Sequence, residues 1–151
     1  MSDVLYRPFL QATQHVFQLM LDLNDVHAEP FNESPQGLDT LEVSIGVTGD
    51  LSGQVVYSFP YETCLTMVNI MSGMEMSEVD DFVTSAISEI ANIISGNVMT
   101  LLTDEQLTCD ILPPQIITCE VDKGKYALDT VSCIVTSVGN ICLDIMLNPA
   151  K

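Results

Sequence analysis

Positive charge is scarce in this sequence. Its 151 residues include 4 Lys and Arg against 21 Asp and Glu, and the formal net charge is −17. Nucleic-acid binding relies on clustered Lys and Arg contacts to phosphates, and anionic membrane surfaces are bound through basic patches. Because 4 basic residues cannot form such a patch, we expect neither a nucleic-acid partner nor a membrane partner.

Signals of metal binding, secretion and membrane spanning are also missing. The cysteines are Cys64, Cys109, Cys119, Cys133 and Cys142. Their number is odd and they form no CxxC or CxxH pair, so we expect neither a disulfide framework nor a zinc site. No apolar run reaches the ~18 residues of a membrane span, and the first residues do not resemble a signal peptide. These absences predict buried thiols in a reducing, cytoplasmic location.

Apolar residues are abundant despite the high charge. Hydrophobic residues make up 47% of the chain and charged residues 17%. Disordered chains combine high net charge with low hydrophobicity, so this composition predicts a folded protein. A chain of this length usually forms one domain and buries about two-thirds of the surface of its unfolded state. We therefore expect a single domain over residues 1–151.

The first half of the chain predicts a helix followed by a hairpin. Apolar residues recur at helical spacing over residues 7–23, and residues 26–31 suggest a short strand. Residues 32–39 are typical of a loop. Apolar and polar residues then alternate over residues 41–47 and again over residues 54–59, on either side of a glycine-containing turn. This two-residue period predicts a β-hairpin.

The second half predicts two helices and three strands. Residues 61–71 carry apolar residues at helical spacing directly after Pro60. A longer helix is expected from Ser77, as its N-cap, to about Leu102. The strands are expected at residues 116–121, 128–138 and 140–147. This order predicts an α+β fold, a mostly antiparallel sheet of about six strands with long helices packed on one face.

A narrow stripe of polar and small residues lies along the longer helix. At about 100° per residue, Glu89, Asn92 and Gly96 all fall within about 40° of Ser85. The opposite side carries the apolar residues Val83, Ile87, Ile90, Ile94, Val98 and Leu101. A solvated helix face would explain polar residues, but Ser, Asn and Gly are poor helix formers. The pattern therefore favours a functional surface without naming its reaction.

The same stripe resembles a known family signature. Ser85-x3-Glu89-x2-Asn92, with Pro114 following twenty-two positions after the Asn, resembles the motif of the CheC/CheX/FliY chemotaxis phosphatases. The hairpin glycines within residues 46–53 and the order of elements are similar as well. Only one Glu-Asn pair is present and no extra domain is expected, so the resemblance favours the CheX branch. It implies a CheC-like fold.

The resemblance also implies a reaction. The substrate would be the aspartyl phosphate of a CheY-like receiver, and the enzyme would be a response-regulator phosphatase. The receiver supplies Mg²⁺, a Lys and an acidic cluster, so no cofactor or metal is expected on this chain. By this resemblance Asn92 positions the attacking water and Glu89 pairs with the receiver's Lys. A neutral carboxamide suits that role because it adds no negative charge beside the phosphoryl group.

Other assignments stay open at this point. Ser85 either contacts the receiver or is merely small, and Gly96 either allows close approach or relieves crowding within the helix. The alternative function is a non-catalytic receiver-binding or scaffold module of the same fold, and a third is an unrelated acidic binding protein. The resemblance further implies a homodimer joined edge to edge, with residues 128–138 or 140–147 as the edge strand.

Overall fold

The computed structural model describes residues 2–22, 27–29, 40–117 and 126–149. The helices in these ranges are α1 (Ser2–Leu21), α2 (Tyr61–Ser72) and α3 (Asp81–Asp104). The strands are β1 (His27–Glu29), β2 (Thr40–Gly49), β3 (Leu51–Pro60), β4 (Cys109–Ile111), β5 (Gln115–Ile116), β6 (Leu128–Thr136) and β7 (Gly139–Pro149). None of the described helices has the length and apolar character needed to cross a membrane.

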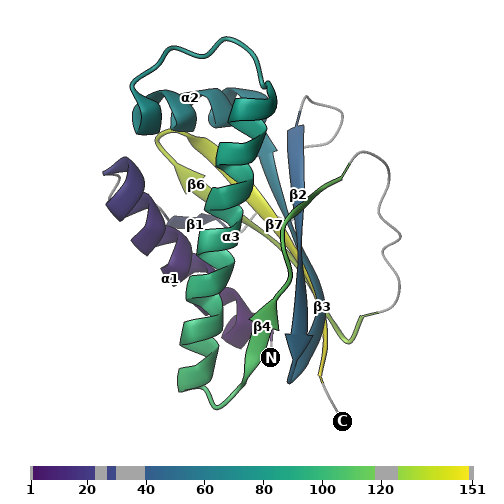
Figure 1. Cartoon of the computed structure of the whole chain (residues 1–151). Helices are drawn as coiled ribbons and strands as arrows, with labels where there is room; N and C mark the ends of the chain where they lie inside the picture. Colours follow the sequence, from purple (N-terminus) through teal and green to yellow (C-terminus); the bar gives the residue numbers. More distant parts are fainter. Residues whose placement is uncertain (1, 23–26, 30–39, 118–125, 150–151) are drawn as a thin grey trace.

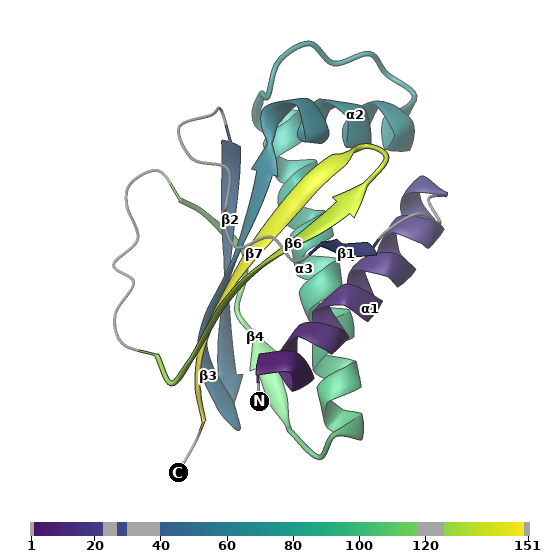
Figure 2. The same cartoon turned by 180° about the vertical axis from the view of Figure 1, so that it is seen from behind.

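One antiparallel sheet contains all of these strands. Its order is β1-β6-β7-β3-β2-β4, and β5 pairs with β2 along the same edge as β4. Figures 1 and 2 show α1 and α3 packed beside each other on one face of the sheet, with α2 at one end of this layer. The predicted α+β fold with helices on one face is confirmed, and the described sheet has seven strands where about six were expected.

The core forms where the two-residue period of the strands meets the helical period of α3. Val43 and Ile45 of β2 are completely buried on the helix side, whereas Ser44 between them faces the other side of the sheet. Against this surface α3 buries Val83, Ile87, Ile90, Ile94 and Val98. Each such side chain contributes about 1.5–3 kcal/mol when fully buried. Burial of this face leaves the opposite face of α3 outside the core.

The turn between β2 and β3 is bound to the segment that follows α3. The Asp50 amide donates to the Thr108 carbonyl (2.9 Å), and the Thr108 amide donates to an Asp50 carboxylate oxygen (2.7 Å). Gly49 has a φ of 111°, and a Cβ at this position would collide with the Thr108 carbonyl. These contacts hold β4 against β2. The sequence pattern missed β4 because its three residues are too few to show alternation.

The predicted start of α3 is wrong. Ser77 was expected as the N-cap, but the helix begins at Asp81 and its N-cap is Asp80. The Asp80 carboxylate accepts a hydrogen bond from the Val83 amide (3.0 Å), which satisfies one of the free amides of the first turn. Both residue types can cap a helix, so composition alone did not distinguish them.

Other element boundaries differ by a few residues. α1 begins at Ser2 rather than residue 7 and contains Pro8 in its second turn, where the proline lacks the amide that would donate to the carbonyl four residues earlier. β1 lies within the predicted strand at residues 26–31, and the other residues of that range lie outside the described residues. The predicted loop at 32–39 lies outside the described residues, as does the part of the predicted strand 116–121 that follows Ile117.

The prediction that all cysteines are free thiols is wrong for one pair. Cys133 of β6 and Cys142 of β7 form a disulfide. The two residues lie directly opposite each other in the hairpin register, with their Cα atoms 4.1 Å apart. Their spacing along the chain matches no disulfide motif, and only the register of the strands reveals the pair. Cys64 is a buried free thiol and Cys109 a partly buried one, while Cys119 lies outside the described residues.

The cap of α3 provides a test of its boundary. Replacing Asp80→Ala removes the hydrogen bond to the Val83 amide and should lower the free energy of unfolding by about 1 kcal/mol. Ser77→Ala is the matched control, because Ser77 lies outside the helix and should change stability little. Urea denaturation of the two variants checks this. A larger loss of unfolding free energy for Ser77→Ala than for Asp80→Ala would place the N-cap at Ser77, as the sequence predicts.

Candidate functional site

The predicted stripe lies on the outer side of α3. Ser85 and Glu89 are exposed, and Asn92 and Gly96 are half-buried. In Figure 1 α3 runs along the front of the molecule, and its apolar face covers the sheet behind it. All four residues therefore lie on one side of a single helix, from its second turn to its fifth.

The side chains of this stripe have no internal partners. Within the described ranges, no hydrogen bond or ion pair engages Ser85, Glu89 or Asn92. By contrast, Asn97 on the same helix donates its side-chain amide to the Ile93 carbonyl (2.9 Å). Asn92 thus presents a carboxamide that can both donate and accept, and Glu89 one turn earlier presents a carboxylate that accepts. The pair is available to a molecule that approaches from outside.

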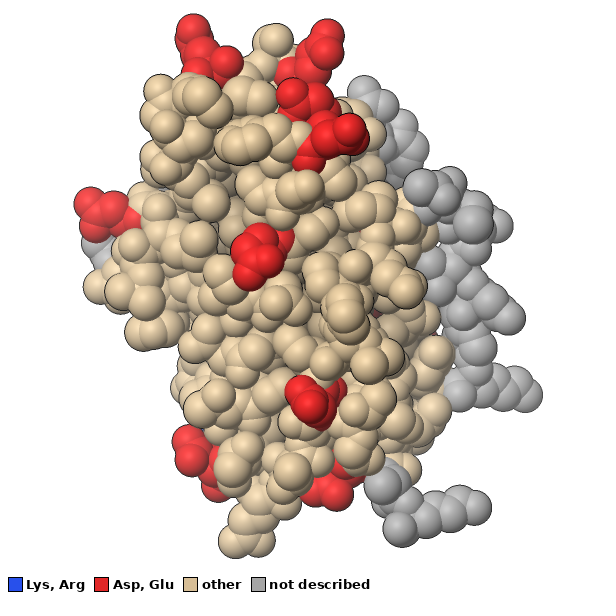
Figure 3. All heavy atoms as spheres, viewed as in Figure 1, with Lys and Arg blue, Asp and Glu red and all other residues tan. Residues whose placement is uncertain are grey.

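The surface around the stripe lacks positive charge. Figure 3 shows Asp and Glu side chains distributed over this face and, among the residues that the structure describes, no Lys or Arg on it. Arg7, on α1, is the one basic residue in the part of the chain that the structure describes. Phe82, one turn before Ser85, is 48% exposed and extends the same side of α3 toward the start of the helix. The described part of the site therefore offers hydrogen-bonding and apolar groups but no Lys or Arg.

A buried hydrogen bond lies behind the stripe. The Tyr57 hydroxyl on β3 and the Ser95 hydroxyl on α3 are 2.7 Å apart, and both side chains are buried. Burial raises the pKa of Tyr57 well above its usual range, and the hydrogen bond with Ser95 offsets this only in part. The tyrosine is therefore neutral at ordinary pH. The sequence patterns did not predict this pair, although a tyrosine within the alternating apolar pattern of β3 was a visible signal.

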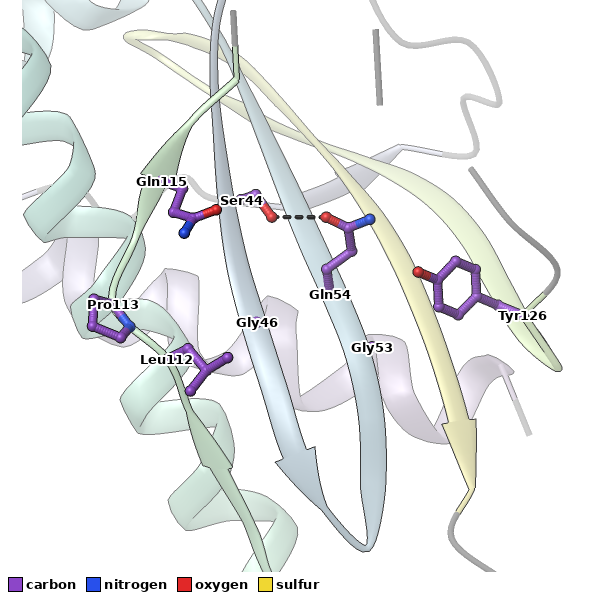
Figure 4. Close-up of a pocket in the computed structure, with 8 residues that line it drawn as sticks. All are labelled: Ser44, Gly46, Gly53, Gln54, Leu112, Pro113, Gln115 and Tyr126. Atoms are coloured by element: carbon purple, nitrogen blue, oxygen red, sulfur yellow. Dashed lines mark hydrogen bonds between the residues drawn. The ribbon is translucent and has the colours of Figure 1, made fainter. Parts of the chain in front are cut away.

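A small hollow lies on the opposite face of the sheet. It has a volume of about 250 Å³ and is lined by Ser44, Gly46, Gly53, Gln54, Leu112, Pro113, Gln115 and Tyr126. Figure 4 shows the polar side chains converging there, with the Ser44 hydroxyl donating to the Gln54 carbonyl oxygen (2.8 Å). None of these lining residues is a carboxylate or an imidazole, and none belongs to the stripe. The hollow and the stripe are thus separate features.

Two further expectations concern the surroundings of the site. Pro114 lies half-buried between β4 and β5, in the segment that crosses the edge of β2. This position agrees with a role in shaping the chain before a strand. In the described ranges, no group of three or more His, Cys, Asp and Glu side chains could hold a metal ion.

Comparison with known proteins relates the chain to one family. The family model described as "Chemotaxis phosphatase CheX" matches residues 42–136. A curated relative, the CheY-P phosphatase CheX of Thermotoga maritima, is 37% identical over 86 residues, which are 56% of this chain and 54% of the relative. The chain thus spans about half the length of the curated relative it matches.

Solved structures of similar fold include two CheX proteins. The CheX-CheY-BeF3-Mg²⁺ complex from Borrelia burgdorferi has a chain that is 25% identical with a TM-score of 0.74, covering 95% of this chain and 97% of that one. The chemotaxis protein CheX from Vibrio vulnificus is 18% identical with a TM-score of 0.81, covering 95% and 99% of the two chains. The second likeness establishes the fold alone.

The stripe glycine provides a test of local conformation. A Cβ added at Gly96 would meet no atom within 4 Å, and alanine is the better helix former, so Gly96→Ala should raise the free energy of unfolding by about 1 kcal/mol. Gly73→Ala is the control, because its Cβ also has open space but its φ is 71°. That change should lower the free energy by about 1 kcal/mol. Chemical denaturation measures both changes. If the free energy of unfolding changes in the same direction in both variants, the helical conformation of Gly96 or the left-handed conformation of Gly73 is contradicted.

Proposed function

Because the chain belongs to the CheX family of chemotaxis phosphatases, we propose that it hydrolyses the aspartyl phosphate of a CheY-like receiver through Asn92 and Glu89. One observation carries the proposal. A carboxamide and a carboxylate lie one turn apart on the outer side of α3, and within the described residues neither has a partner. A related CheX is a CheY-P phosphatase, and another forms a complex with CheY.

The reaction is the hydrolysis of an acyl phosphate. The oxygen of a water molecule forms a bond to phosphorus while the bond from phosphorus to the receiver's aspartyl oxygen breaks. Asn92 accepts a hydrogen bond from this water and holds it in line with the breaking bond. The products are inorganic phosphate and the free aspartate of the receiver. Since a carboxamide is neutral, Asn92 approaches the phosphoryl group without electrostatic repulsion.

The positive charge for this reaction comes from the receiver. Phosphoryl transfer needs cations around the phosphoryl oxygens, usually Mg²⁺ and a Lys. The described residues of this chain contain only Arg7 as a cation and no metal-holding cluster. We assign Mg²⁺ to the receiver and pair Glu89 with the receiver's Lys. That ion pair orients the docked proteins and places Asn92 over the phosphoryl group.

Ser85 and Gly96 then contact the receiver on either side of the catalytic pair. The space around the Gly96 Cβ position is empty of this chain's own atoms, which leaves room for a partner surface close to the helix backbone. Ser85 is exposed one turn before Glu89. Small side chains at both positions let the two catalytic side chains reach furthest from the surface.

The catalytic assignment is tested by the decay of a phosphorylated receiver in Mg²⁺, measured with and without this protein. Asn92→Ala should lower kcat about 100-fold, the usual loss when one group that acts on the transition state is removed. Glu89→Ala should lower kcat/KM about 10-fold or more, because it removes a charged contact across the interface. The controls make the same changes outside the stripe: Asn97→Ala on the same helix and Glu105→Ala at its C-cap.

The outcomes distinguish the candidate functions. Equal activity of the stripe variants and their controls would contradict the catalytic assignment. Binding of the phosphorylated receiver without any change in the lifetime of its phosphate would support the alternative, a non-catalytic receiver-binding or scaffold module. A location in the cytoplasm follows from the proposed substrate, and reducing conditions there would favour the thiol form of Cys133 and Cys142.

We also propose a homodimer joined through β6. Of the two strands considered for the edge, β7 lies between β6 and β3 and is unavailable. The described residues of β1 pair with Cys133, Ile134 and Val135. The outer side of β6 over residues 128–132 has no partner strand within the described residues. An exposed edge of this kind is a template for pairing with a second chain.

The dimer predicts a sedimentation mass of twice 16.5 kDa. Amide hydrogen exchange at residues 128–132 should slow as the protein concentration rises, because these amides become paired. Exchange in β4, at the opposite edge of the sheet, serves as the control and should not depend on concentration. A monomer mass throughout, with exchange in β6 independent of concentration, would contradict the proposal.

A further inference from the structure

We infer that the buried hydrogen bond between Tyr57 and Ser95 is a positioning contact that sets the rotation of α3 and thereby the direction of Asn92. The inference rests on the proposed phosphatase function and adds two residues to it. Neither residue touches the receiver, since both are buried. They act through the helix that carries Asn92.

The Tyr57 end of this contact belongs to the most constrained part of the sheet. Tyr57 lies on β3, opposite Val43 of β2 on one side and Leu143 of β7 on the other. Its ring is completely buried and stacks with that of Phe59, with the ring centres 6.3 Å apart. Strands paired on both sides move little, so the Tyr57 hydroxyl is a fixed point beneath α3.

The Ser95 end lies close to the catalytic residue. Ser95 follows Asn92 by three residues, which is about 4.5 Å along a helix axis. It is the one polar residue among those that α3 buries: Val83, Ile87, Ile90, Ala91, Ile94, Ser95, Val98, Met99 and Leu102. This directional contact between the buried face of α3 and the sheet is therefore made within one turn of Asn92.

The apolar contacts alone would leave the rotation of the helix weakly defined. Hydrophobic burial is non-directional and depends mainly on area, so a face of Ile and Val side chains tolerates a small rotation at little cost. A hydrogen bond requires both a short distance and a favourable angle. With an outer radius of about 5 Å, a rotation of about 20° moves a side-chain atom by about 2 Å. Displacements of this size reduce catalysis strongly when a group must hold a water in line.

The other hydrogen bonds of α3 side chains do not supply this constraint. The Asn97 amide and the Thr100 and Thr103 hydroxyls donate to carbonyls of α3 itself, at Ile93, Gly96 and Met99. Bonds within one helix rotate together with it. Among the described residues, Tyr57 and Ser95 form the side-chain hydrogen bond that joins α3 to the sheet.

The experiment compares Tyr57→Phe, Ser95→Ala and the double variant with Thr13→Val. Thr13 is the matched control because its buried hydroxyl donates to the Phe9 carbonyl inside α1. The expected result is a fall in kcat of about 10-fold for each single variant, with KM changed less than about 2-fold. Thr13→Val should lower the unfolding midpoint and leave kcat unchanged.

The double variant separates positioning from stability. Removing both hydroxyls leaves no unpaired buried group, so the unfolding midpoint should recover toward that of the wild type. If the hydrogen bond between Tyr57 and Ser95 positions α3, kcat stays low in the double variant. If kcat recovers together with the midpoint, or if Tyr57→Phe affects kcat no more than Thr13→Val does, the inference is wrong.

A spectroscopic readout keeps this test independent of the proposed function. The ¹⁵N side-chain resonance of Asn92 and the backbone resonances of residues 85–96 should shift in Tyr57→Phe and not in Thr13→Val. Absence of these shifts overturns the positioning role even in an active enzyme. The resonances could also shift while the wild-type protein hydrolyses the receiver's phosphate no faster than Asn92→Ala does. That result would overturn the phosphatase function, and the effect of Tyr57 on α3 would stand.

Discussion

The packing of α3 on the sheet is the constraint from which the rest of the structure follows. Its Ile and Val side chains meet the inward residues of β2 and β3 in a dry interface, and that burial decides which side of the helix faces outward. The stripe of Ser85, Glu89, Asn92 and Gly96 lies on the side of the helix that this packing leaves facing outward. A site of this kind needs no pocket, because a rigid helix presents its groups to a partner that brings the rest of the chemistry.

The charge of the chain agrees with a division of the catalytic groups between two proteins. A net charge of −17 with 4 basic residues leaves this protein unable to clamp a phosphoryl group by itself. On the proposed mechanism it contributes the groups that a receiver's active site lacks, a neutral amide for the water and a carboxylate for the partner's cation. On the same proposal the acidic surface imposes selectivity, since a phosphoryl group already neutralised by its own protein approaches the stripe more favourably than a bare one.

Local patterns in the sequence were sufficient for the longer elements and for the position of the stripe, and insufficient for the short strand β4, for the start of α3 and for contacts between distant residues. The β2–β3 hairpin and the outward side of α3 follow from periods of two and 3.6 residues. Asp80 and Ser77 compete as caps with similar chemistry, and only the folded chain selects Asp80. Cys133 and Cys142 meet through strand register. Tyr57 and Ser95, 38 residues apart, meet only when the helix lies on the sheet.

The place of β7 in the sheet has a consequence for how the protein is made. This strand is the last described in the chain, yet it lies between β6 and β3, near the middle of the sheet. During synthesis the residues of α3 leave the ribosome well before the strand that completes the surface beneath them. Until β7 inserts, β3 and β6 each have an open edge and the core is incomplete, the condition in which chains aggregate or bind chaperones. The stripe on α3 therefore reaches its final structure only after β7, which is translated later, has joined the sheet.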